Sequence, residues 1–133
     1  MSDPKSVLIV LADHDRRVRT RKMCEESFGL TVTTIASPLE GLSLFNKIKA
    51  PGFILLSSDP LPLMTYEEFL RFLGRNPQLA RIPVVLLSLK PVVPVPSGVT
   101  EQVEAPISLK TLGELVKKYC VSPNDTSTPA PKI

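Results

Sequence analysis

The chain has 133 residues, which is enough for one domain with a core on both faces of a sheet. Its 43% hydrophobic and 22% charged residues are ordinary for a globular protein, and a net charge of +3 does not by itself indicate nucleic-acid binding. No apolar run approaches the length of a membrane span and no signal peptide is visible, so we expect a cytoplasmic protein. The two cysteines, Cys24 and Cys120, are then expected to be buried and reduced.

Short apolar runs recur along the chain and predict five strands. Ser6–Leu11 and Pro83–Leu89 are continuous apolar runs, typical of strands that are buried on both faces of a parallel sheet. Leu30–Ala36, Phe53–Leu56 and Thr100–Glu104 predict three shorter strands. Because helical segments separate the first four strands, the pattern predicts a doubly wound α/β sheet with right-handed crossovers.

Capping residues mark where the helices begin. Asp13 or Asp15 is the expected N-cap of a helix over Arg16–Phe28, which ends at Gly29. The other predicted helices begin at Ser37 with Pro38, at the capping box of Thr65 and Glu68, and at Ser108, where one apolar face contains Leu109, Leu112, Leu115, Val116 and Tyr119.

A proline-rich segment, Lys90–Thr100, lies where another crossover helix is due. Pro91, Pro94 and Pro96 remove amide donors and disfavour a helical path, so the segment is expected to be extended. An exposed apolar patch here would mark a binding surface. We expect instead that the segment's valines pack inward: Val92, Val93, Val95 and Val99.

The order of these pieces resembles the receiver domain of two-component response regulators over about residues 5–121. The motifs that carry the resemblance are the opening SVLIVL, Phe28-Gly29-Leu30, Leu39-Glu40-Gly41-Leu42, Pro51-Gly52-Phe53-Ile54-Leu55-Leu56, Ile82-Pro83-Val84-Val85 and Ala105-Pro106-Ile107. The resemblance implies a five-stranded parallel sheet in the order 2-1-3-4-5, here with the helix before the fifth strand missing or replaced by the proline-rich segment. Residues 1–121 would form this domain, and residues 122–133, rich in Pro, Ser and Thr, a disordered tail or linker.

Receiver domains transfer a phosphoryl group to an Asp at the end of the third strand, with Mg²⁺ bound by an acidic pair after the first strand. By resemblance, the acceptor position falls on Ser57, the acidic pair on Leu11 and Ala12, and the family's Lys on Ala105. The family's Ser or Thr after the fourth strand is retained in type as Ser88. A serine hydroxyl cannot form an acyl phosphate, and two magnesium ligands are missing. We therefore expect a degenerate receiver that is not an enzyme and that needs no metal or cofactor.

Three carboxylates leave an alternative open. Asp13, Asp15 and Asp59 belong to loops at the carboxyl ends of the predicted strands, where α/β sheets hold ligands. They could form a residual acidic cluster, with Asp59 or Asp13 as a displaced phosphoacceptor, although helix caps at Asp13 and Asp15 and a turn at Asp59 explain them better. A lone histidine in a loop, His14, is not expected to have a chemical role.

A run of basic residues occupies the first two turns of the first predicted helix. It places cations where the helix dipole disfavours them, at Arg16, Arg17, Arg19, Arg21 and Lys22. A solvated helix face, an acidic protein partner or, less favoured, a nucleic acid would each explain this run. Together with Pro91, Pro94 and Pro96, these residues form the candidate interaction surfaces. The sequence thus predicts a non-phosphorylatable interaction module of a bacterial two-component-type pathway, and leaves its partner and oligomeric state open.

Overall fold

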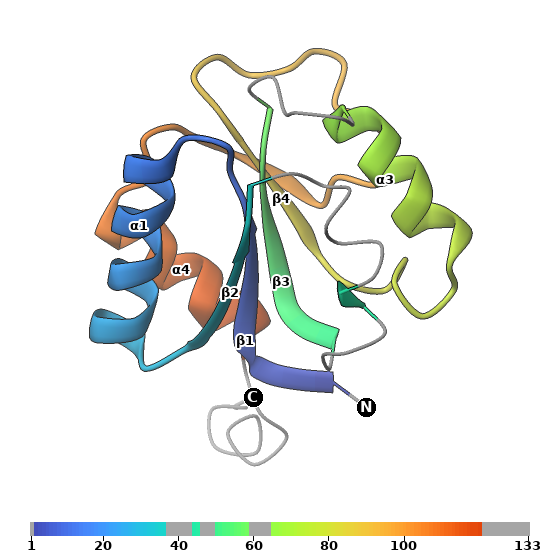
Figure 1. Ribbon diagram of the computed structural model, residues 1–133. Coiled ribbons are helices and arrows are strands. Elements are labelled where there is room, and N and C mark those ends of the chain that lie inside the picture. Colours follow the sequence, from blue (N-terminus) through green and yellow to red (C-terminus); the bar gives the residue numbers. More distant parts are fainter. Residues whose placement is uncertain (1, 37–43, 46–49, 59–64, 121–133) are drawn as a thin grey trace, which may run out of the picture.

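A computed structural model describes residues 2–36, 44–45, 50–58 and 65–120 (Figure 1). The predicted helix at Ser37 and Pro38, the loop that contains Asp59 and the tail 122–133 lie outside the described residues. In chain order the elements are β1 (Ser2–Val10), α1 (His14–Lys22), the π-helical turn η1 (Met23–Ser27), β2 (Thr31–Ile35), β3 (Ala50–Ser57), α3 (Tyr66–Arg75), β4 (Val84–Ser88), β5 (Glu101–Glu104) and α4 (Leu109–Tyr119).

The five strands form one parallel sheet in the order β2-β1-β3-β4-β5, as predicted. Figure 1 shows α1 and α4 on one face of this sheet and α3 on the other. None of the described helices is long and apolar enough to cross a membrane.

The inner strand β1 contributes to both layers of the core, one on each face of the sheet. Successive side chains of a strand point to opposite faces, so Val7 and Ile9 pack under α1 and α4, whereas Leu8 and Val10 pack under α3. All four side chains are at most 1% exposed. A continuous apolar run is therefore required at this position in the sheet, because both faces of the strand are covered.

The first helix begins as the sequence predicts. The Asp13 carboxylate accepts a hydrogen bond from the Arg16 amide (3.0 Å), which makes Asp13 the N-cap and leaves Asp15 in the first turn. The helix does not run evenly to its end, because it widens into η1, which buries Cys24. Gly29 ends it with a positive φ of 64°, and the Leu30 amide bonds back to the Cys24 carbonyl (3.1 Å).

The caps of α3 and α4 are also confirmed. Thr65 and Glu68 form the reciprocal capping box of α3, and the Ser108 side chain accepts from the Thr111 amide at the start of α4. The predicted apolar face of α4 is wrong at one position: Leu109 is 52% exposed, because it is the first helical residue and follows the exposed Ser108.

The far end of α4 is tied to β5. The Tyr119 hydroxyl and the Lys118 ammonium both donate to the Glu101 carboxylate. Burial opposes ionisation of Glu101, but these two hydrogen bonds outweigh it and hold the pKa of the carboxyl below its usual range. Burial, followed by the neighbouring Glu101 carboxylate, raises the pKa of Tyr119 to about 12.

No helix joins β4 to β5, as the prolines predict. The segment is fastened over the sheet by a side-chain amide, since Gln102 accepts from the Val92 amide (2.8 Å) and donates to the Val92 carbonyl (2.9 Å). The expectation that all of the valines pack inward was wrong. Val92 and Val99 pack on the α3 side of the core, whereas Val93 is 85% and Val95 56% exposed. Neighbouring residues of an extended chain point to opposite sides, so Val92 and Val93 cannot both face the core.

Both cysteines are buried and neither is in a disulfide, as predicted. Burial first, and then the neighbouring Cys120 and Glu25, raises the pKa of the Cys24 thiol to about 12. The Cys24 thiol is therefore protonated and unreactive near neutral pH.

Candidate functional site

The carboxyl ends of the parallel strands meet at one side of the sheet, where α/β proteins hold their ligands. The last paired residues of β1 and β3 are Val10 and Leu56, so the next residues, Leu11 and Ser57, lie at the ends of neighbouring strands. Ser57 pairs in turn with Leu87, beside Ser88 at the end of β4. Leu11, Ser57 and Ser88, which are far apart along the chain, therefore lie at the ends of adjacent strands.

The two serines at these strand ends are buried. Ser57 is 1% and Ser88 3% exposed. The Ser88 hydroxyl has no hydrogen-bond partner within the described part of the chain. Ala105 follows β5, is also buried, and donates its amide hydrogen to the Ser88 carbonyl (2.8 Å). Ser57, Ser88 and Ala105, which the resemblance assigns to the family's acceptor, Ser or Thr and Lys positions, are therefore neutral and buried.

Only two of the three carboxylates expected in a residual cluster lie within the described residues, so the cluster stays a prediction. The Asp13 carboxylate caps α1, Asp15 is an exposed first-turn residue, and Asp59 lies outside the described residues. Over residues 2–36, 44–45, 50–58 and 65–120, no three His, Cys, Asp or Glu side chains form a group that could hold a metal ion.

An arginine that the sequence placed on a helix surface lies instead at this strand end. The Arg17 guanidinium donates through Nη1 to the carbonyl oxygens of Leu11 (2.9 Å) and Ala12 (3.1 Å). Its Nη2 lies 3.3 Å from Nδ1 of His14, so the exposed histidine is a neighbour of this guanidinium. The side chain of Arg17 is half-buried and reaches back from the first turn of α1 to the end of β1.

These residues do not fit Mg²⁺. Magnesium in proteins is held by one or two carboxylates with near-octahedral geometry, and Leu11, Ala12 and Ser57 supply none. The backbone carbonyl oxygens of Leu11 and Ala12 already accept from Arg17. The guanidinium also places a permanent positive charge at this point, which disfavours a second cation nearby.

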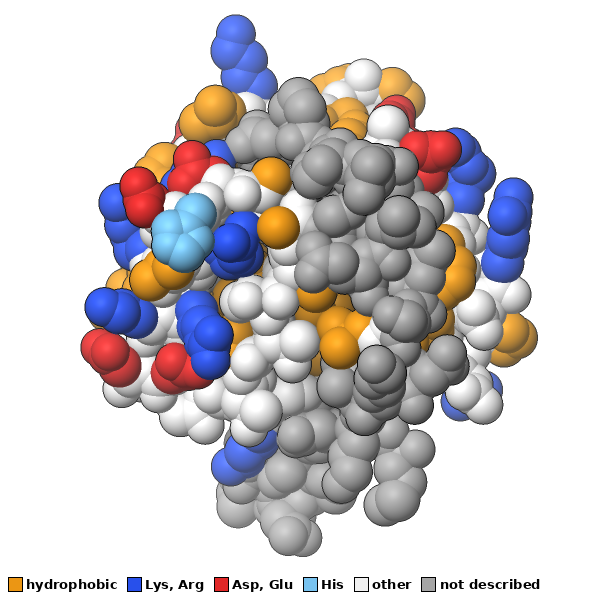
Figure 2. Space-filling view, viewed as in Figure 1, with side chains coloured by type: hydrophobic (Ala, Val, Ile, Leu, Met, Phe, Trp, Pro, Cys, Tyr) orange, Lys and Arg blue, Asp and Glu red, His pale blue; other side chains and the backbone are white. Residues whose placement is uncertain are grey.

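The basic run of α1 is not a uniform surface. Arg21 pairs with Glu25 (3.0 Å), although this orientation along a helix is the less favourable one for an ion pair. Arg17 binds backbone carbonyls, whereas the exposed Arg19 guanidinium has no partner in the described portion of the chain. Figure 2 shows Lys and Arg side chains, with several Asp and Glu side chains among them, gathered over α1.

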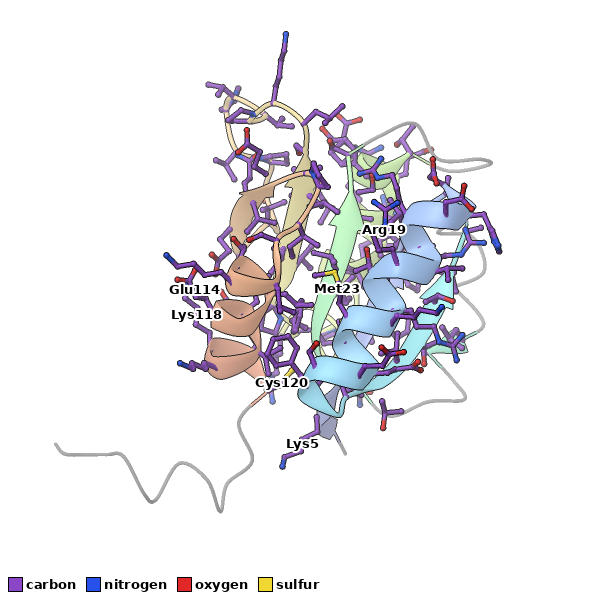
Figure 3. The ribbon with its side chains drawn as sticks, turned by 90° about the vertical axis from the view of Figure 1, so that its left-hand side faces the viewer. Lys5, Arg19, Met23, Glu114, Lys118 and Cys120 are labelled. Carbon is purple, nitrogen blue, oxygen red and sulfur yellow. The ribbon has the colours of Figure 1, made fainter. Side chains whose placement is uncertain are left out.

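A cleft lies between α1 and the connection from β5 to α4. Its cavity volume is about 20 Å³, it opens to solvent, and most of its lining is apolar. The apolar lining residues are Leu11, Met23, Leu87, Pro106 and Ile107, and the cationic ones are Arg16 and Arg19. Figure 3 shows that Arg19 and Met23 lie on the side of α1 and η1 that faces α4. The cleft is a shallow hollow that is far too small to enclose a cofactor, and it offers a partner an apolar surface with a cationic rim.

The proline-rich segment presents a second apolar surface. Pro91 and Pro94 are exposed, as are Val93 and Val95, while Pro96 is half-buried. The clamp between Gln102 and Val92 holds the segment in place beneath these side chains.

Sequence reasoning missed three of these features: the Arg17 contact, the Gln102 clamp and the cleft. Only the first left a signal in the sequence. A cation in the first turn of a helix is disfavoured by the dipole, which suggests that it has another partner. The other two features depend on how distant segments pack.

No protein-family model matches the chain, and no curated protein matches it. Solved structures do. The receiver domain of a sensor histidine kinase from Pseudomonas aeruginosa, described with a magnesium ion in its active-site cleft, has a TM-score of 0.77 at 16% identity, over 87% of this chain and 97% of that one. A receiver domain of a signal transduction histidine kinase from Syntrophus aciditrophicus gives 0.72 at 19% identity, over 97% and 96% of the two chains. The chemotaxis response regulator CheY4 of Vibrio cholerae gives 0.74 at 20% identity, over 86% and 97%. The chain therefore has the fold of response-regulator receiver domains.

Proposed function

We propose that this chain is a receiver-fold protein-interaction module that works without phosphorylation, in a bacterial two-component-type pathway. The observation that supports the proposal is a strand-end site without a carboxylate among Leu11, Ala12, Ser57 and Ala105, the residues that the resemblance assigns to the acidic, acceptor and lysine positions. A site without an acceptor carboxylate has no group that forms an acyl phosphate, and a site without the acidic pair lacks the ligands for Mg²⁺. What remains for such a domain is its surface.

The lining of the cleft beside α1 indicates which kind of protein partner would bind there. An apolar side chain of the partner would rest against the apolar surface around Met23, and a neighbouring carboxylate would pair with Arg19. An acidic segment with one apolar anchor residue matches this combination of an apolar wall and a cationic rim. It is the acidic protein partner that the basic run of α1 favours.

Acetyl phosphate with a divalent metal tests the first half of the proposal. The intact mass of the chain should stay unchanged after incubation with acetyl phosphate and Mg²⁺, because no carboxylate stands at the acceptor position. If the mass increases by one phosphoryl group, and if this increase is absent in the Asp59→Asn or the Asp13→Asn variant, the proposal would be overturned in favour of a displaced phosphoacceptor. The Asp13→Asn change is informative because asparagine is also a good N-cap and preserves the helix start.

Peptide binding tests the second half. A fluorescein-labelled peptide of glutamates around a single phenylalanine should bind the chain, with anisotropy as the readout. Arg19→Glu should weaken binding, whereas Lys117→Glu, which changes the net charge equally on the exposed side of α4, should not. Loss of binding in Val93→Ser rather than in Arg19→Glu would move the surface to the proline-rich segment.

Nucleic acid is the competing ligand of the basic run. If duplex DNA binds with a steep salt dependence, and if this binding is lost when the charge of Arg19 or Arg21 is reversed, nucleic acid would replace an acidic peptide as the partner. The pairing of Arg21 with Glu25 and of Arg17 with backbone carbonyls leaves few free cations on this helix, which favours the peptide.

A further inference from the structure

We propose that β2 pairs with the β2 of a second copy of this chain and so joins the two sheets into one. This goes beyond the proposed function, because the surface is an edge of the sheet and not the cleft beside α1. Two strands stand at the ends of the sheet, β2 and β5. The outer side of an end strand presents backbone donors and acceptors that another chain can bind.

The outer edge of β2 is formed by the backbone of Val32 and Thr34. The Leu11 amide donates to the Ile35 carbonyl (3.1 Å), so the backbone of Ile35 faces β1. Because the backbone groups of successive residues in a strand point to opposite sides, Val32 and Thr34 turn theirs away from β1. Over the part of the chain that the structure describes, β2 pairs with no strand other than β1. Two amides and two carbonyls of β2 therefore face outward.

The residues of β2 do not protect this edge from pairing. Edge strands of natural proteins often carry charged residues, a proline or a bulge. The strand β2 consists of threonine, valine and isoleucine, and its register with β1 is continuous. The other end strand, β5, carries Glu101 and Glu104. Two copies of β5 would bring carboxylates together, whereas two copies of β2 bring no charges together.

The surroundings of β2 also allow a second copy to approach. Figure 1 views the sheet edge-on with β2 nearest the viewer, and Figure 2 shows in the same view a strip of uncharged atoms beside the charged side chains over α1. The end of α1 and η1 both contact β2. Their exposed charges are two bases and two acids: Arg21, Lys22, Glu25 and Glu26. These charges cancel, so two copies do not repel each other at this edge.

The outward groups of β2 determine how the two strands pair. Antiparallel pairing about a two-fold axis at Thr33 sets Val32 opposite Thr34 of the second copy. Residues that both turn their backbone towards the partner strand form a hydrogen-bonded pair and exchange two hydrogen bonds. Thr33 then lies opposite Thr33 of the second copy, as a pair without backbone hydrogen bonds whose Cα atoms are about 4.5 Å apart. Both kinds of pair bring β-branched side chains together, which stabilises a sheet.

The mass of the chain in solution tests whether the dimer forms. Sedimentation equilibrium should show a rise from 14.6 kDa towards twice that value as the concentration increases. Because β2 is short, the contact is small, and the measurement extends to about 1 mM protein. Thr34→Pro removes an outward amide and leaves the hydrogen bonds between β1 and β2 in place, so it should abolish the rise in mass. Circular dichroism checks that this variant is folded.

Cysteine cross-linking tests the position of the two-fold axis. In Thr33→Cys, two thiols meet at a Cα separation that a disulfide spans, so oxidised glutathione should produce a covalent dimer. Thr31→Cys is the matched control, because residue 31 would face Ile35 of the second copy and its two thiols would lie too far apart. The native Cys24 and Cys120 are buried and should not cross-link.

A mass that stays at 14.6 kDa over the whole concentration range would overturn the inference. A dimer that persists in folded Thr34→Pro would overturn it too, and so would equal cross-linking of Thr33→Cys and Thr31→Cys. A dimer that is lost in Val93→Ser and not in Thr34→Pro would place the contact on the proline-rich segment instead. If Thr34→Pro does not fold, the two cysteine variants decide, since neither of them removes a backbone hydrogen bond.

Discussion

The clamp between Gln102 and Val92 allows a quantitative prediction about the segment that replaces a crossover helix. Gln102→Leu keeps the size of the side chain and removes both hydrogen bonds to the Val92 backbone. Each bond is worth about 1 kcal/mol net, and the half-buried amide and carbonyl of Val92 would be left without partners, so unfolding should become easier by about 2–3 kcal/mol. This is a large share of the roughly 5–15 kcal/mol that stabilises a typical domain.

Urea denaturation measures the global loss, and hydrogen exchange of the Val92 amide measures the local one. Gln102→Glu is the matched variant, because its carboxylate still accepts from the Val92 amide but cannot donate to the carbonyl. It should lose about half as much stability as Gln102→Leu. A loss below about 0.5 kcal/mol in Gln102→Leu, with unchanged exchange at Val92, would refute the view that this side chain holds the segment.

Three further predictions concern caps, core and pH. Thr65→Ala removes the capping box of α3 and should cost about 1 kcal/mol in urea denaturation; an unchanged midpoint would contradict the role of the cap. Leu112→Ala should cost about 2–5 kcal/mol because the side chain is fully buried, whereas Leu109→Ala on the same helix should cost well under half of that, and similar losses would contradict the assignment of the buried face. The pKa of Tyr119 is raised in the folded protein to about 12, so the unfolded chain releases the phenolic proton at a lower pH than the folded chain does. The protonated Tyr119 therefore stabilises the fold at neutral pH, and this stabilisation is lost as the pH rises from about 10 towards 12. Tyr119→Phe should flatten the decline of the urea midpoint over this pH range, and an equally steep decline would refute the assignment.

The strands and caps were predictable because each rests on local chemistry. An apolar run such as Val7–Val10 has to be covered on both faces, and Asp13, Thr65 and Ser108 stand directly before helical patterns. The missing crossover helix was predictable for the same reason, since prolines cannot donate the backbone hydrogen bonds that a helix needs.

The parts that could not be predicted depend on the packing of separate segments. Whether Arg17 faces solvent or the end of β1 is decided by the direction in which α1 leaves the strand. The exposure of Val93 and the burial of Val92 follow from the point at which Gln102, ten residues away, fixes the chain. At the strand end, the resemblance supplied the residue positions, and only the folded structure shows that the Arg17 guanidinium lies beside them.

The place of β1 in the sheet has a consequence for how the protein is made. This strand is synthesised before β3, which pairs with it, and long before α4, whose Leu112 and Leu115 belong to the core layer that covers one of its faces. A nascent chain on the ribosome therefore carries an uncovered apolar strand until most of the domain has emerged. Such a segment is prone to aggregate during synthesis, and the domain gains its full core only when the last helix docks.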